Sequence, residues 1–264
     1  GAKQPANFDG ITINHRADGG CRSEKFDRDI RLLTEDIAKN PDNIEVNGRS
    51  HFYLAQSYKD LRQWANALPN YEKRVLAGGW PEEVYFSLYQ IGVCKMNIEC
   101  AKKSGQNPWT FLGDLLRAYW YRPQRLEAIY TVAKFCRLNN IHKFGYHVGL
   151  MAVDNKYPKD DFLFIERDVH EWKFFDEMSL LAWNCQDFAL AHKLGKRIID
   201  EKKYPSDQHE RLQKCMGFYN EKYKPVIAAA PKSIEPVCID SKCIDAKCSD
   251  SKCSEAKVRE TTNI

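Results

Sequence analysis

The stretch of sequence that decides the fold is His51-Phe-Tyr-Leu-Ala-Gln-Ser-Tyr-Lys-Asp-Leu-Arg-Gln-Trp-Ala-Asn-Ala-Leu-Pro-Asn-Tyr71. Its apolar and small residues recur at helical spacing, with Tyr58 three residues after the pair Leu54-Ala55 and Tyr71 one turn after Ala67. Residues three or four apart share one face of a helix, and small residues let a neighbouring helix approach closely. The stretch therefore predicts two helices that cross at their small side chains.

The same spacing fits two further places along the chain. A fourth unit begins near Ile91-Gly92, and an insertion at residues 102–106 displaces its second helix, which ends near Ala118. Three units in one frame favour a stack of helix pairs over a generic antiparallel bundle. The corresponding positions are Cys136, Gly145, Gly149 and Ala152 after the pair Val132-Ala133, and Ala182, Ala191 and Gly195 after the pair Met178-Ser179.

This helix-turn-helix pattern of roughly 34 residues is similar to the tetratricopeptide (TPR) repeat. The predicted fold class is therefore all-α, a right-handed α-solenoid of about four TPR-like helix pairs. Two residues depart from the pattern. Arg62 stands where the turn usually has glycine, and Pro69 falls inside a predicted helix, which it is expected to bend.

Changes in composition divide the chain into three predicted parts. Helical spacing with short Pro and Gly breakers extends over residues 23–224, the TPR-like domain. Residues 1–22 begin with Gly1-Ala2, typical of the scar of a cleaved tag, and include an alternating segment at 11–14 that is expected to be a strand left from a preceding domain. Residues 225–264 are a low-complexity tail of Cys-Lys pentapeptides, predicted to be disordered.

Charge and hydropathy limit the classes of partner. The chain has 40 basic and 36 acidic residues, and a formal charge of +4 is too balanced to predict nucleic-acid binding. No long apolar run occurs, and the first residues lack the apolar core of a secretory signal. We therefore expect a soluble, cytoplasmic chain with no membrane span and no nucleic-acid partner.

The ten cysteines fall into two groups. Those of the tail recur every five residues, whereas zinc sites usually pair cysteines two to four residues apart, so no metal site is predicted there. Metal binding and redox cross-linking by the tail remain less favoured alternatives. The tail cysteines are Cys238, Cys243, Cys248 and Cys253; the others, interpreted as reduced core residues, are Cys21, Cys94, Cys100, Cys136, Cys185 and Cys215.

No catalytic motif is complete in the sequence. His170-Glu171 begins like a zinc-protease motif, but Phe174 stands where the second histidine is needed. His142 and His147 are expected to be solvated or packed. A Gly-rich phosphate loop, a Gly-x-Ser-x-Gly elbow and a plausible triad are also missing. The chain is therefore predicted not to be catalytic by itself and to hold no metal or cofactor.

A binding surface is the stronger candidate for function. The first helix of each pair lines a concave groove in such a solenoid, and the spacing projects Phe52, Phe86 and a set of aromatic and basic side chains into it. That combination suits an acidic peptide, a phosphate-bearing glycan or a carboxylate, although ordinary solvated helix surfaces are the alternative. The candidate binding residues are Arg49, Gln56, Lys59, Tyr89, Asn97, Tyr130, Lys134, Arg137, Lys173 and Trp183.

Longer segments show a more specific resemblance. In their residues and in their order along the chain, they resemble the TPR region that follows the catalytic domain in a group of family-two glycosyltransferases of bacteria and large viruses. The resemblance covers about residues 10–222. The segments are 18–29, 52–61, 71–75 with 78–83, 122–125 and 157–164. Their motif residues, for which ion pairs and caps between helices are an alternative to ligand binding, are Arg22, Lys25, Arg28, Arg74, Trp80, Glu83, Arg122, Arg125, Asp160 and Asp161. For Trp80 and Asp160, which look buried, we favour the structural role.

The resemblance implies a nucleotide-sugar-binding GT-A domain with a divalent metal, preceding this chain in a parent glycosyltransferase. Residues 11–15 look like the last strand of that domain, where the family tends to have a His-His pair. Here Asn14 takes the first place, and His15 is carried over as a remnant of the active site. The predicted function is thus a non-catalytic module that positions a protein or glycan acceptor, acidic ones included. The alternative is a free-standing TPR adaptor that binds acidic peptides.

Overall fold

A computed structural model describes residues 23–102, 105 and 107–223. These residues form ten α-helices, a π-helical turn (η1), a 3-10 turn (η2) and no strand. The predictions for residues 1–22, His15 included, and for the cysteine tail lie outside the described residues. The elements are α1 (Ser23–Ala38), α2 (Ile44–Asp60), α3 (Trp64–Ala77), α4 (Pro81–Cys100), α5 (Trp109–Tyr121), α6 (Glu127–Leu138), α7 (His142–Leu150), η1 (Val169–Lys173), α8 (Phe174–Asn184), α9 (Phe188–Glu201), η2 (Ser206–Gln208) and α10 (His209–Lys222).

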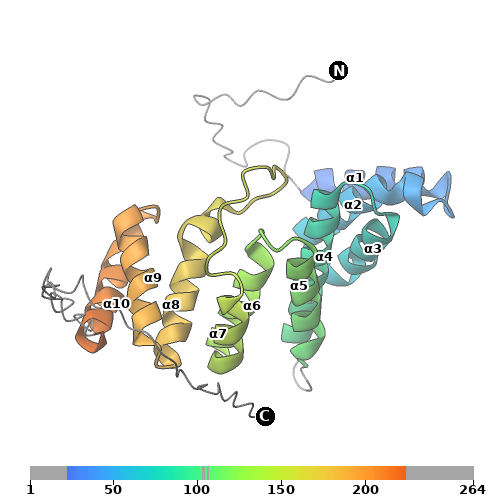
Figure 1. Cartoon of the computed structure of the whole chain (residues 1–264). Helices are drawn as coiled ribbons and strands as arrows, with labels where there is room; N and C mark the ends of the chain where they lie inside the picture. The colour runs from blue at the N-terminus through green and yellow to red at the C-terminus, as the bar shows by residue number, and fades with distance from the viewer. Residues whose placement is uncertain (1–22, 103–104, 106, 224–264) are drawn as a thin grey trace, which may run out of the picture. The chain divides into compact units, whose positions relative to one another are not determined.

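Consecutive helices pack against one another along the chain, as Figure 1 shows. α1 packs on α2, α3 on both α2 and α4, and α9 on both α8 and α10, while α6 also contacts α8. A stack in which each helix pair rests on its neighbours is an α-solenoid. The predicted fold class is therefore confirmed, with four pairs (α2/α3, α4/α5, α6/α7 and α8/α9) flanked by α1 and α10.

Three of the pairs share one turn geometry. Arg62, Asn140 and Gln186 follow the first helix of their pairs and have positive φ values of 56°, 59° and 65°. The next N–H in each turn reaches back five residues, as in a Schellman helix end. Arg62 thus adopts a left-handed conformation that glycine would take at about 1–2 kcal/mol less cost. The bonds are Gln63 N to Tyr58 O (2.8 Å), Ile141 N to Cys136 O (2.8 Å) and Asp187 N to Ala182 O (2.9 Å).

The fourth pair, α4/α5, is connected differently, as the insertion predicts. α4 continues to Cys100 and α5 begins only at Trp109. Pro81 takes the first position of α4, where the missing N–H has no partner to lose. Pro69 lies inside α3, which nevertheless remains one helix over its whole length.

The small residues at helix crossings lie where the spacing places them. A Cβ added to Gly145 on α7 would stand 2.6 Å from the Cβ of Cys136 on α6 and 3.3 Å from Leu181. Neither the Cβ atom nor the fully buried Leu181 has room to yield. The close approach of α6, α7 and α8 therefore requires glycine at this position.

Replacing Gly145 by alanine is expected to destabilise the protein by about 1–3 kcal/mol, because overpacking outweighs the helix propensity of alanine. Gly113 on α5 is the matched control, since a Cβ there meets no atom within 4 Å. Gly113→Ala should stabilise by about 0.5–1 kcal/mol. Urea unfolding followed by circular dichroism measures both, and equal effects of the two substitutions would contradict the close-packing account.

Burial corrects some expectations about individual residues. Cys94 and Cys136 are fully buried as predicted, but Cys100 is exposed at the end of α4. Trp80 is 45% exposed because it caps α4 at the surface, and Asp160 is exposed in the connection between α7 and η1. The structural role favoured for these two residues therefore does not rest on burial.

None of the helices in the described residues combines the length and the apolar character that a membrane span needs. The same part of the chain brings together no group of three or more histidine, cysteine or acidic side chains that could hold a metal ion.

Candidate functional site

Residues 151–168, which we call the strap, connect α7 to η1 and leave the stack of helices in Figure 1. Connections in compact domains are usually about 4–6 residues long, and those longer than about 12–15 residues are uncommon and are usually either functional or linker segments. The strap lies against the first helices of three pairs, as the contacts below show. It is the feature that most alters the predicted groove.

Glu82 of α4 holds the main chain of the strap. Its Oε2 atom accepts the N–H groups of Phe162 and Leu163, both at 2.6 Å, and the side chain is only 5% exposed. A carboxylate in the first turn of a helix also benefits from the helix dipole. The buried charge is thus satisfied by the strap rather than by another side chain.

Two arginines from the turn between α5 and α6 hold the strap from the other side. Arg122 forms a bidentate pair with Asp161, at 2.7 Å and 2.5 Å. Arg125 is fully buried and donates to the carbonyl oxygens of Leu163 and Phe164, each at 3.1 Å. This fork geometry is one that an arginine, and not a lysine, provides.

Glu127, at the start of α6, joins Arg125 to the rest of the network. It accepts from Arg125 at 2.8 Å, from Tyr85 OH at 3.1 Å and from the N–H of Glu166 at 3.1 Å. Burial acts to raise the pKa of Glu127, but the neighbouring His170 and the Arg125 guanidinium lower it by a larger amount. The pKa of Glu127 is therefore about 2, below its ordinary value of 4.5. His170 Nε2 lies 3.4 Å from Glu127 Oε1, but the angle between the two groups is outside the range of a hydrogen bond.

Aromatic rings complete the contact between strap and helices. The ring of Phe164 lies 4.7 Å from that of Phe86 and 6.4 Å from that of Phe52, centroid to centroid. Phe164 has a φ of 47°, a left-handed conformation that costs a bulky residue of the order of 1–3 kcal/mol. Phe52 and Phe86 are consequently buried instead of lining an open groove.

The first-helix face stays open beyond the strap, in two adjoining clefts. The apolar cleft, about 300 Å³, lies between α4 and α6. The charged cleft, about 530 Å³, lies between α6, α8 and α10. Tyr130 and Lys134 line both clefts and so connect them. The other lining residues that matter below are Tyr89, Met96 and Leu138 in the apolar cleft and Arg137, Lys173, Asp176, Glu177 and Arg211 in the charged cleft.

The acids of the charged cleft are buried and already paired. Asp176 accepts from both guanidinium nitrogens of Arg211, at 3.2 Å and 2.8 Å, and Glu177 pairs with Arg137. Burial raises the pKa of Asp176, an effect that Arg211 opposes. The charged groups that remain accessible in this cleft are therefore the cationic ones.

Lys134 has no carboxylate partner among the described residues. Its ammonium group lies 5.7 Å from the centre of the Tyr130 ring, a cation–π contact, and the side chain is exposed. Lys173, further along the charged cleft, pairs with Asp168 at 3.1 Å. Lys134 is therefore the cation best placed to meet an anionic ligand.

The structure brings five of the ten predicted binding residues together at the two clefts: Tyr89, Tyr130, Lys134, Arg137 and Lys173. The other five lie elsewhere, which corrects the expectation of one continuous groove. Trp183 packs against Phe188 and Tyr219 at the α8–α10 end, and Asn97 donates to the Val93 carbonyl of its own helix. Arg49 interacts with Tyr53, Gln56 lines a cleft beside α1, and Lys59 lies over the Phe86 ring.

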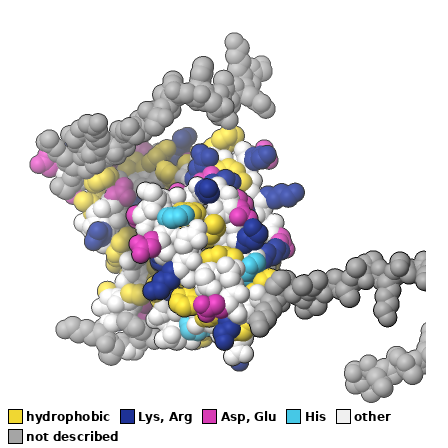
Figure 2. Space-filling model, turned by 90° about the vertical axis from the view of Figure 1, so that its left-hand side faces the viewer, with side chains coloured by type: hydrophobic (Ala, Val, Ile, Leu, Met, Phe, Trp, Pro, Cys, Tyr) yellow, Lys and Arg dark blue, Asp and Glu magenta, His cyan; other side chains and the backbone are white. Residues whose placement is uncertain are grey.

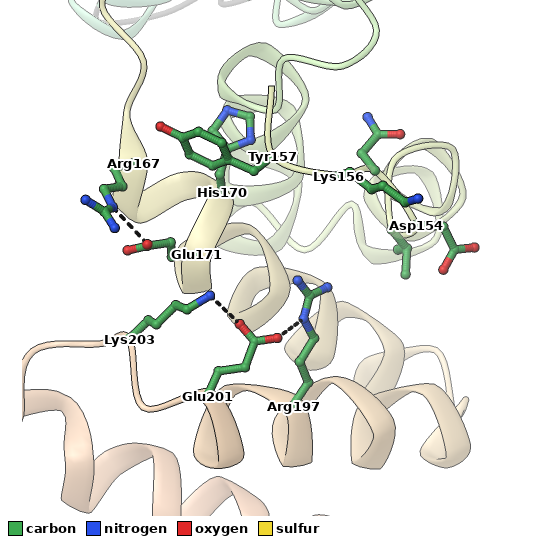
Figure 3. A pocket seen from close by; sticks show the side chains of 11 residues that line it. Asp154, Lys156, Tyr157, Arg167, His170, Glu171, Arg197, Glu201 and Lys203 are labelled. Atoms are coloured by element: carbon green, nitrogen blue, oxygen red, sulfur yellow. Dashed lines mark hydrogen bonds and ion pairs between the residues drawn. The ribbon is translucent and has the colours of Figure 1, made fainter. Parts of the chain in front are cut away.

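Figure 3 shows a further cavity, of about 760 Å³, between the strap, η1 and α9. Its charges largely satisfy one another: Arg167 pairs with Glu171, and Glu201 bridges Arg197 and Lys203. The surface of the α9–α10 end likewise intersperses basic and acidic side chains (Figure 2). Neither region presents a charge pattern that selects one class of ligand.

Sequence reasoning missed Glu82 and Glu127 as the carboxylates that hold the strap. Nothing in their local spacing distinguishes them from ordinary acidic residues at the start of a helix. Arg122, Arg125 and Asp161 are among the motif residues singled out in the sequence, and their ion pairs agree with the structural alternative for them. The pair Arg74–Glu83, at 2.9 Å, agrees with it as well.

The fold and the clefts define a class of protein, the TPR-like α-solenoids. Among solved structures, the crystal structure of MamA, a TPR-like helical protein, is similar, with a TM-score of 0.50 over 73% of this chain and 97% of MamA. The identity is 15%, so the likeness shows the fold alone. No model of a protein family matches this chain. No curated protein matches it either.

Proposed function

We propose that this chain is a non-catalytic TPR-like module that binds an acidic segment of a protein partner at the two open clefts. The observation that carries the proposal is Lys134, an exposed cation without a carboxylate partner among the described residues, at the junction of the clefts. A carboxylate there would form a charge-assisted hydrogen bond. The apolar cleft beside it offers room for an adjacent apolar side chain.

Three features of the clefts support this ligand chemistry. The acids Asp176 and Glu177 are paired with Arg211 and Arg137, so their charges are offset and repel an approaching carboxylate less than free surface acids would. Arg137 and Arg211 are the more exposed members of these two ion pairs, so the pairs present their cationic side to the cleft. Leu138, 61% exposed at the rim of the apolar cleft, supplies contact area for an apolar anchor.

The larger context that we propose is a glycosyltransferase, in which this module positions a protein or glycan acceptor. The support is the resemblance of the sequence segments, whose arginines and acids form the ion pairs that hold the strap. The nucleotide sugar and the divalent metal would then belong to a separate catalytic domain and not to this chain. A free-standing adaptor for acidic peptides is the second candidate, favoured by the unpaired Lys134.

Binding of labelled peptides and glycans to the chain tests both candidates. Peptides with an acidic residue next to leucine or methionine should bind with fluorescence polarisation that falls as salt rises. A lysine-containing version of each peptide is the control. Selective binding of a glycan would favour the glycosyltransferase context, whereas failure of every acidic peptide and glycan would remove the proposal.

Reversal of the Lys134 charge is expected to weaken acidic-peptide binding about tenfold or more, because a hydrogen bond to a charged group contributes about 1.5–3 kcal/mol. Lys193→Glu is the matched control, since Lys193 is an exposed lysine of α9 that lines neither cleft. The affinity of the Lys193→Glu variant for the acidic peptide should match that of the unchanged chain. Equal losses in Lys134→Glu and Lys193→Glu would show a general charge effect and not a site.

A further inference from the structure

We propose that the groove between α2, α4 and α6 is a binding site for an extended acidic–aromatic segment of a partner protein, and that the strap occupies this site in the free chain. This groove adjoins the apolar cleft and shares one residue, Tyr89, with it. The groups that hold most of its occupant are Glu82, Arg122, Arg125 and the Phe52–Phe86 pair, and none of them lines either cleft. Either proposal can therefore fail without the other.

The groove binds the main chain of the strap through hydrogen bonds. Glu82 accepts two consecutive N–H groups, and Arg125 donates to the next two carbonyl oxygens. Contacts to main-chain atoms do not depend on the side chains of the bound segment. They are the means by which peptide-binding domains obtain affinity for an extended chain.

The groove also contacts three side chains of the strap, and these contacts would give specificity for a sequence pattern. Arg122 forms its bidentate pair with Asp161, the Phe52–Phe86 pair receives Phe164, and Tyr89 OH lies 3.4 Å from the carboxylate of Glu166. The recognised pattern is therefore an acidic residue, then an aromatic residue three positions later and a second acidic residue two positions after that. A segment of another protein with this pattern presents the same groups.

The strap itself fits this site imperfectly. Phe164 is held at a positive φ, and 47% of its surface stays exposed. Phe162 is 66% exposed although the main chain beside it is firmly held. The strap must also return to η1, whereas a segment from another chain is free of that constraint and can adopt a relaxed conformation. A partner segment can thus compete for the site.

A synthetic peptide of residues 158–168, PKDDFLFIERD, is the probe. The host is the full chain with Asp161→Asn and Phe164→Ala, which remove two side-chain contacts of the strap and leave the groove unchanged. Titration calorimetry should show binding to this variant at least about tenfold tighter than to the unchanged chain, because the intact strap competes at high effective concentration. The peptide with the same two substitutions should not bind.

Two results would overturn the proposal. One is the absence of peptide binding to a variant that still unfolds cooperatively by circular dichroism. The other is a variant that becomes a dimer in light scattering at the concentration used, which would assign the groove to the strap of a second copy.

Hydrogen exchange of the unchanged chain tests the proposal without any variant. If a partner can replace the strap, the amides of Phe162 and Leu163 should exchange through a local opening, faster than the core amides of α4 and α6. Exchange of these two amides only with global unfolding would sink the idea, because the groove would then never be vacant in the folded protein.

Discussion

Arg125→Ala is expected to lower the free energy of unfolding by about 3–5 kcal/mol, the cost of leaving a buried charge without its partner. The arginine is fully buried between α6 and the strap. Its removal leaves Glu127 without the Arg125 guanidinium and the carbonyl oxygens of Leu163 and Phe164 without a donor. Urea unfolding at neutral pH, followed by circular dichroism, measures the loss.

Two control variants make the result specific. Arg117→Ala removes an exposed arginine of α5 and should change stability by less than about 0.5 kcal/mol. Arg125→Lys keeps the charge but cannot reach a carboxylate and two carbonyl groups at once, so it should recover less than half of the loss. A loss below about 1 kcal/mol in Arg125→Ala would show that the network is not what holds the strap.

The second large effect is expected on acidification. The pKa of Glu127 is about 2 in the folded chain, against an ordinary value of 4.5. The unfolded chain therefore binds the proton first, and stability falls as the pH drops from about 4.5 towards 2. A shift of this size corresponds to about 3 kcal/mol, present in full above pH 5 and largely lost near pH 2.

Glu127→Gln isolates this contribution, because a neutral side chain cannot take up the proton. The variant should be less stable than the unchanged chain at pH 6, and the difference should shrink by about 3 kcal/mol towards pH 2. Asp176, whose pKa burial raises, acts in the opposite direction in both chains and cancels in the comparison. Parallel pH profiles for the two chains would contradict the role given to Glu127.

The helix pairs could be predicted because their signals are local. The small residues at 55, 67, 145 and 191 mark crossings by their spacing alone, since a close approach needs a small side chain on whichever helix provides it. The insertion before α5 could be predicted as well, because it displaces the spacing of these small residues. The left-handed conformation at Arg62, Asn140 and Gln186 is harder to predict, because none of the three is glycine and only asparagine is a residue type that favours it.

The residues of the proposed binding site could be grouped only in part from the sequence. Tyr130, Lys134 and Arg137 fall on one face of a single helix, so helical spacing groups them correctly. Phe52 and Phe86 are also on the first-helix face, but the strap covers them. The strap comes from residues about 80–110 positions further along the chain, a separation at which residue spacing carries no information.

By itself the sequence determined that this chain is a stack of TPR-like helix pairs, because helix formation and close crossing depend on residues a few positions apart. Only the tertiary structure decided which part of the first-helix face is open. Glu82, Arg125 and Glu127 are ordinary charged residues until the fold brings the strap against them. Burial strengthens their hydrogen bonds to the strap, which covers one part of the first-helix face. The other part stays open as the two clefts, with Lys134 where they join.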